Sequence, residues 1–252
     1  MIPLRDSIPS RHTPWMTWAI IGACTLVFVV ETLLPRPVLE SVITLLGIVP
    51  ARYTHPEWAA AIGFPADDFW PFLTSMFLHG SWGHLLGNMW FLWIFGDNVE
   101  DRMGPWRYLL FYLLCGVAAG VVHWWTNPAS TVPTVGASGA IAGVMGAYMV
   151  MFPHSRIIVM LPLLFWPLVF EVPAVLFLFY WFALQLVTGT ASLLGPGQVG
   201  GVAWWAHVGG FVFGVLCYRL FLRRHRRRRL FPDEFGLEAG WFRDVSGRNP
   251  WV

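Results

Sequence analysis

Two residues that lie far apart in the sequence could form a nucleophile and its base. Ser138 lies in G-A-S-G and His207 in A-H-V-G-G, and each falls near the start of a long apolar run. A serine hydroxyl is a weak nucleophile until a base accepts its proton, and a neutral imidazole is suited to that role. Ionisable side chains inside apolar segments are costly and are functional candidates by default. The pair therefore predicts a catalytic Ser138–His207 dyad.

A third motif, H-L-L-G-N, places His84 and Asn88 four residues apart, on one face of a helix. Acyl transfer needs donors that stabilise an oxyanion. The ring of His84, the amide of Asn88 and the backbone N–H of Ser138 could supply them. The simpler alternatives are a helix–helix hydrogen bond for Asn88 and a packing contact with a neighbouring carbonyl for His207.

No acidic residue is expected to complete a triad. The acids nearest to the apolar segments lie at other depths or on a segment of open placement: Glu31, Asp97, Glu100, Asp101 and Glu171. The residue two after the serine is alanine, so the G-x-S-x-G elbow of soluble hydrolases is absent too. The sequence therefore predicts a dyad.

Glycines accompany both candidate residues at helical spacing. G-x-x-x-G pairs allow two helix backbones to approach closely, although the motif is common in membrane spans. Here one pair directly follows the candidate serine and another follows the candidate histidine. We expect these glycines to support packing that brings the two side chains within hydrogen-bond reach. The set is Gly136, Gly139, Gly143, Gly210 and Gly214.

Composition indicates the elements that must position these residues. Of the 252 residues, 56% are hydrophobic and 12% are charged, whereas soluble domains carry about 25% charged residues. The chain is therefore predicted to be a polytopic membrane protein. A span needs roughly 20 apolar residues, and six runs meet that need. They cover residues 15–34, 82–99, 106–125, 135–152, 173–187 and 202–222.

Two further regions have apolar stretches that are too short, or too often interrupted by proline, to cross a membrane. Residues 35–81 are interpreted as a first external loop that is partly embedded in the membrane interface. Residues 157–172 are apolar but contain Pro162 and Pro167, so they could lie in the interface or extend the fifth span. The predicted organisation is an N-terminal segment over 1–14, a six-span domain over 15–222 and a basic tail over 223–252.

Orientation follows from the arginines, because the chain contains no lysine. Six spans place both termini on one side, and that side holds most of the arginines, including the run over 223–229. The positive-inside rule predicts that this side is the cytoplasm, in a plasma membrane such as a bacterial inner membrane. Contact with anionic lipid explains the basic tail, so nucleic-acid binding is not expected. All four candidate polar side chains then lie in one layer near the external face.

The three motifs together resemble the signatures of rhomboid intramembrane serine proteases. H-L-L-G-N, G-A-S-G and A-H-V-G-G-F-V-F-G agree with that family in order, interval and predicted depth from residue 84 to residue 214. The resemblance implies an all-α, six-transmembrane-helix bundle with a Ser138–His207 dyad and with His84 and Asn88 as oxyanion donors. It implies cleavage of transmembrane protein substrates near their external ends, without a cofactor. It also implies that the fifth span acts as a mobile lateral gate.

Two positions depart from the family pattern. Many members carry Trp-Arg in the first loop, where this chain has Trp70-Pro71. Some members place an aromatic residue one turn after the serine, where this chain has Ala142. We therefore expect Trp204 or Trp205 to hold His207 instead. The resemblance also assigns His79 a role in bracing the loop.

Two other classes of function are less favoured. A non-catalytic membrane protein could bind or transport substrates through a polar groove, but the chain shows no convincing internal repeat and its polar layer lies near one surface. A metal site is disfavoured because H-E-x-x-H and a cysteine cluster are absent. The candidate ligands for such a metal site are His79, His84, His123 and His207.

Overall fold

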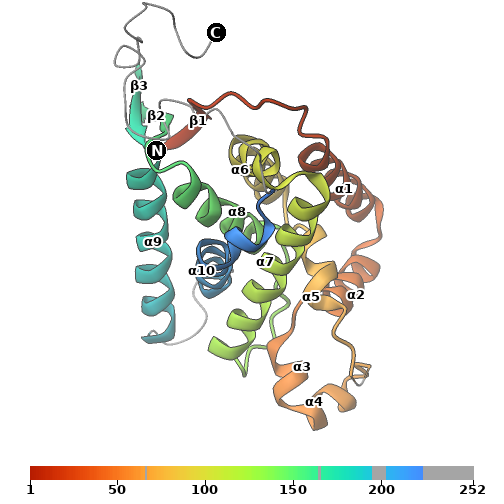
Figure 1. Ribbon diagram of the computed structural model, residues 1–252. Helices are drawn as coiled ribbons and strands as arrows, with labels where there is room; N and C mark the ends of the chain where they lie inside the picture. Colours follow the sequence, from red (N-terminus) through yellow and green to blue (C-terminus); the bar gives the residue numbers. More distant parts are fainter. Residues whose placement is uncertain (66, 164–165, 195–202, 224–252) are drawn as a thin grey trace, which may run out of the picture.

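The computed structural model describes residues 1–65, 67–163, 166–194 and 203–223. Within these residues, six long helices form a bundle (Figure 1), and each overlaps one of the six predicted spans. They are α1 (Trp15–Leu33), α6 (Trp82–Met103), α7 (Pro105–Thr126), α8 (Ser138–Met151), α9 (Ala174–Leu194) and α10 (Trp204–Phe221). By length and composition, α1, α7 and α9 could each cross a membrane. That all six do so stays a prediction. The predicted basic tail beyond Arg223 lies outside the described residues.

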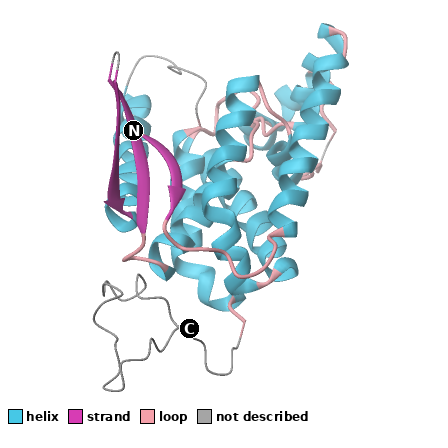
Figure 2. Cartoon of the chain, turned by 90° about the horizontal axis from the view of Figure 1, so that it is seen from above, coloured by secondary structure: helices cyan, strands magenta, loops and turns pink. Residues whose placement is uncertain are grey.

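The expectation of an all-α fold is wrong, because three strands form a small antiparallel sheet. They are β1 (Ile2–Asp6), β2 (Arg156–Leu163) and β3 (Trp166–Pro173), in the order β1-β2-β3. Figure 2 shows the sheet at one side of the bundle, next to α9. The hairpin of β2 and β3 occupies the region that the sequence left open. Pro162 and Pro167, which would disrupt a helix, lie opposite each other in the register.

The N-terminal segment is held to the bundle by a half-buried carboxylate, that of Asp6. The hydroxyl of Tyr148 donates to Asp6 at 2.6 Å, and the amide of Asn98 donates to the same oxygen at 2.8 Å. Burial raises the pKa of Asp6 to about 7, against the lowering effect of the Tyr148 hydroxyl. These bonds connect β1 to α8 and to α6.

The predicted first external loop contains four short α-helices and a 3₁₀ turn at Ser75–Phe77. The helices are α2 (Arg36–Leu46), α3 (Pro50–Thr54), α4 (Pro56–Ala61) and α5 (Pro71–Thr74). Each has a proline in its first two positions, where the missing N–H costs no hydrogen bond. A backbone bridge between Ile48 and Thr134 joins this loop to the segment that precedes α8.

The helix α8 is enclosed by its neighbours and is in direct backbone contact with α10. Every residue of α8 from Gly139 to Tyr148 is buried. A methyl group added to Gly210 would overlap the carbonyl oxygen of Gly139, and one on Gly214 would overlap that of Gly143. The 14 residues of α8 extend about 21 Å, less than the roughly 30 Å of a hydrocarbon core. A helix this short can begin below the membrane surface.

Candidate active site

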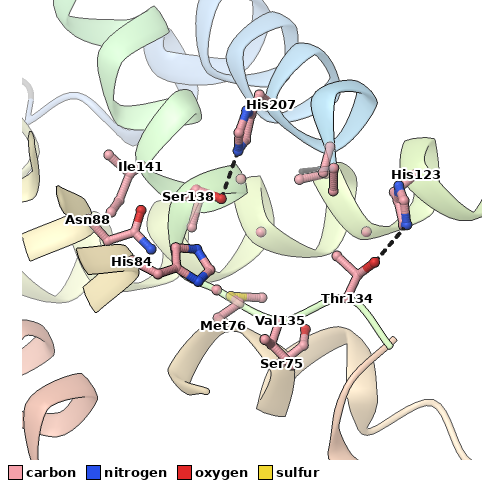
Figure 3. A pocket seen from close by; sticks show the side chains of 18 of the residues that line it. Ser75, Met76, His84, Asn88, His123, Thr134, Val135, Ser138, Ile141 and His207 are labelled. Carbon is pink, nitrogen blue, oxygen red and sulfur yellow. Dashed lines mark hydrogen bonds between the residues drawn. The ribbon is translucent and has the colours of Figure 1, made fainter. Parts of the chain in front are cut away.

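Ser138 and His207 meet where α8 and α10 lie together. Ser138 is the first residue of α8, and His207 lies in the first turn of α10. The distance between Ser138 Oγ and His207 Nε2 is 2.8 Å (Figure 3). The sequence placed the start of this helix three residues earlier, at Val135, so the serine occupies the helix end and not its second turn. Ser138 lines a pocket at this end of the helix.

A third polar side chain, which the sequence analysis missed, completes a chain of hydrogen bonds. Gln185 is buried on α9, and its Oε1 lies 2.8 Å from His207 Nδ1. Its Nε2 donates to the backbone carbonyl of Trp181 at 3.2 Å, which fixes the orientation of the amide. An amide oxygen only accepts, so Nδ1 of His207 carries the proton and Nε2 is free to accept from Ser138.

The ring of His207 is also held by indoles. The ring centroid of Trp204 lies 6.3 Å from that of His207, in an edge-on arrangement. The ring centroid of Trp181, on α9, lies 5.8 Å from it. Of the two tryptophans that the sequence suggested, Trp204 is therefore the one in ring contact. The indole N–H of Trp205 instead donates to the Gly189 carbonyl. Indoles from α9 and α10 thus pack on the His207 ring. In some family members an aromatic residue at the position of Ala142 is expected to make this contact.

On the other side of the serine, α6 directs two donors toward the same space. Figure 3 shows His84 and Asn88 beside Ser138, across from His207. Asn88 is only 8% exposed, and its Nδ2 has no hydrogen-bond partner within the described residues. A buried amide without a partner costs free energy, so an oxygen that fills this space would gain from the donor.

Gly136 lies in the loop before α8, and not in a helix–helix contact as the sequence analysis expected. Its φ is +127°, a conformation that side chains rarely adopt, and an added Cβ would lie 2.6 Å from Cε1 of His84. The glycine therefore lets the chain pass close to the imidazole on its way into α8. The backbone amides of Ser138 and the next two residues precede the first internal bond of that helix, from Ile141 to Ala137. Such amides, with the helix dipole behind them, favour negative charge.

A pocket of about 520 Å³ is lined by Ser138, His207, His84, Asn88 and Gly136, and it also reaches His123 and Trp181. His123 points to Thr134, with Nε2 and Oγ1 2.8 Å apart. His79, one turn before α6, is buried with its Nδ1 3.2 Å from the Phe77 carbonyl oxygen. Burial and the neighbouring His84 lower the pKa of His79 to about 4, so it is neutral near pH 7. In the described part of the chain, no three potential ligands are grouped for a metal ion.

The bundle, its apolar helices and a serine–histidine pair in a pocket define a multi-pass membrane protein with a hydrolase-like site. A family model described as the Rhomboid domain matches residues 66–224, more than half of the chain. The chain therefore belongs to the rhomboid family.

Individual relatives come from several compartments. The chain is similar to Rhomboid-like protein 11, chloroplastic, of Arabidopsis thaliana, with 44% identity over 81 residues, 32% of this chain and 28% of that protein. It is 30% identical to Rhomboid protein 1, mitochondrial, of Saccharomyces cerevisiae over 164 residues, 62% of this chain and 44% of that protein. It is 34% identical to the putative rhomboid protease YdcA of Bacillus subtilis over 109 residues, 40% of this chain and 54% of that protein. The matched regions thus span 28% to 54% of these relatives.

Proposed function

We propose that this chain is an intramembrane serine endopeptidase that hydrolyses peptide bonds of transmembrane substrates near their external ends. The observation that carries the proposal is the 2.8 Å contact between Ser138 Oγ and His207 Nε2 inside a pocket. Family membership supports it. We also propose that the chain crosses the membrane six times within residues 15–222. It would lie in a plasma membrane with both termini in the cytoplasm.

The geometry suits a two-step acyl transfer. Nε2 of His207 accepts the hydroxyl proton as Ser138 Oγ attacks the substrate carbonyl carbon. The imidazolium then gives that proton to the leaving amine, which breaks the C–N bond and leaves an acyl-serine. Water repeats the sequence: His207 takes its proton, hydroxide adds to the ester, and Ser138 leaves with the proton returned. Throughout, Nδ1–H stays bonded to Gln185.

The oxyanion of each tetrahedral intermediate would lie between α6 and the start of α8. The amide of Asn88, the ring N–H of His84 and the backbone N–H of Ser138 are the proposed donors. Asn88 Nδ2 has no hydrogen-bond partner among the described residues, which supports this role because a helix-packing amide would already be bonded.

The Asn88→Ala variant is expected to lower kcat by about 10²–10³-fold, as for loss of a single oxyanion donor. The measurement is steady-state cleavage of a single-span substrate in vesicles. Asn98→Ala is the control, since Asn98 is on the same helix but its amide bonds to Asp6 and to the Ile8 carbonyl. It should lower thermal stability without changing kcat. Equal kcat for Asn88→Ala and wild type would assign Asn88 to packing.

Gln185 is proposed as a positioning residue. Gln185→Leu keeps the size but removes the acceptor that selects the tautomer, so kcat should fall, by less than the about 10²–10⁴-fold supplied by a whole general base. Gln185→Glu restores an acceptor and should recover part of the loss. Thr188→Val is the control, because in the described part of the chain the Thr188 hydroxyl donates to carbonyls of its own helix. Equal kcat for Gln185→Leu and Thr188→Val would show that the contact orients nothing.

The proposal is tested by reconstituting the purified chain with a single-span substrate in lipid vesicles. Product masses should place the cut within a few residues of the external membrane surface. A protein that binds the substrate stoichiometrically and leaves it intact would instead support a non-catalytic carrier or binder.

A further inference from the structure

The β2–β3 hairpin has one face that is apolar along its whole length. The four cross-strand pairs on this apolar face are Ile157–Val172, Val159–Phe170, Leu161–Leu168 and Leu163–Trp166. The opposite face carries the charged residues of the hairpin, Arg156 and Glu171, whose charged groups lie 3.4 Å apart. Strand alternation therefore separates an apolar side from a side that carries charge.

The two halves of the apolar face have different surroundings. In the inner half, Ile157 and Val159 are fully buried in the core of the bundle. In the outer half, Leu163 is 51% exposed, Leu168 is 48% exposed and Trp166 is 81% exposed. With the half-buried Leu161, these three form what we call the outer apolar patch. Among the described residues, the same face thus begins on the helices and continues past them exposed.

The direction of this patch follows from the packing of the inner half. The outer half continues the face that rests on the helices, because alternate residues of a strand line one side of the sheet. Figure 1 shows α9 running away from the sheet, and Figure 2, which looks along that direction, shows the strands extended across it. The first turns of α9 expose Leu176 and Phe179. Because α9 is long and apolar enough to cross a membrane, we expect this surface to face lipid, and both strands of the hairpin contact α9.

We propose that the outer apolar patch inserts into the bilayer interface, so that the hairpin lies on the membrane and anchors the start of α9. Tryptophan is enriched at this depth because its ring is amphipathic. Since β3 ends at Pro173 and α9 begins at Ala174, no linker separates the inserted strand from the helix. The helix that carries Gln185 is thereby held by lipid at one end.

The exposed edge of β3 favours lipid over a second copy of the chain. An unpaired strand edge can add a strand from another molecule, but β3 carries Pro167 and Pro173, which have no N–H to donate. The same prolines reduce the number of unpaired donors that a membrane interface would leave unsatisfied.

Two neighbouring positions on β3 allow a matched test. Leu168 and Val169 are 48% and 52% exposed and lie on opposite faces. Each is replaced by cysteine (Leu168→Cys or Val169→Cys) in the full chain, whose three native cysteines are changed to alanine. The single thiol is labelled with the fluorophore NBD, and the protein is reconstituted in vesicles of phosphatidylcholine and phosphatidylglycerol. Quenching is measured with doxyl-labelled lipid and with iodide on both sides of the membrane.

The label at position 168 should emit at shorter wavelength, be quenched by doxyl lipid and be several-fold less sensitive to iodide than the label at 169. Trp166→Cys provides a second measure of the same face and should behave like position 168. Equal iodide quenching at 168 and 169 would place the hairpin in water and overturn the proposal. Protection of position 168 from both quenchers would also overturn it, because protein would then cover the patch.

Discussion

Ser138→Ala is expected to abolish cleavage of a single-span substrate while the protein still inserts and folds. Removal of the nucleophile of a serine protease costs on the order of 10⁶-fold in kcat. The replacement loses one hydroxyl at the first position of α8 and leaves the packing of that helix intact. The measurement is turnover in vesicles together with covalent labelling by a fluorophosphonate, which should disappear.

Comparison of the Ser138→Ala and His207→Ala variants with the double variant tests whether the hydroxyl and the imidazole act as one catalytic unit. His207→Ala and the double variant should lose as much activity as Ser138→Ala, because residues of one catalytic unit are not additive. Ser41→Ala is the control, since the Ser41 hydroxyl, as far as the chain is described, donates to the Pro37 carbonyl of the same helix, α2. Turnover that persists in purified Ser138→Ala would exclude the proposed nucleophile.

The helices could be predicted from sequence because each predicted span is a long apolar run. The sheet could not, because it depends on a partner far away in the chain: Ile2 pairs with Met160. Residues 157–172 also mislead locally. Their apolar face is continuous with the bundle core, and Pro162 and Pro167 interrupt any helical or alternating pattern. A hairpin of this kind is defined by tertiary contacts and not by local preference.

At the site, motif spacing identified residues that the structure brings into one pocket, but it did not identify Gln185. The feature that could have indicated Gln185 is a single amide in the apolar stretch A-L-Q-L-V, where a polar side chain needs a hydrogen-bond partner. Its partner atom, Nδ1 of His207, lies 22 positions away on another helix, so no sequence spacing connects them. The start of α8 was also missed, because Ala137 provides no side-chain cap.

The helix α9 therefore takes part in both proposals. It supplies the acceptor that orients His207, and it begins at the hairpin that we place on the bilayer. The backbone contact between α8 and α10 is independent of α9, because it depends on glycines of those two helices alone. The Ser138–His207 distance consequently has two determinants, which can be varied separately.

The Gly210→Ala variant is expected to impair both activity and stability. The added methyl would overlap the carbonyl oxygen of Gly139, a backbone atom that cannot rotate away, so α10 must shift. Overpacking of a core costs about 1–3 kcal/mol, and a displacement of about 1 Å at a catalytic group can cost 10²-fold in rate. Gly139 and Gly210 lie one and three residues after the proposed dyad partners, so the shift acts directly on the Ser138–His207 distance.

Gly22→Ala on α1 is the matched control, because an added methyl there meets nothing within 4 Å. It should stabilise the protein by up to about 1 kcal/mol, the helix preference of alanine over glycine, with unchanged turnover. Thermal unfolding in detergent and fluorophosphonate labelling rates separate the two effects of Gly210→Ala. If that variant unfolds at the wild-type temperature and is labelled at the wild-type rate, α8 and α10 do not touch through these glycines. The serine and the imidazole would then need another means of approach, because side-chain packing alone keeps helix axes about 8–10 Å apart.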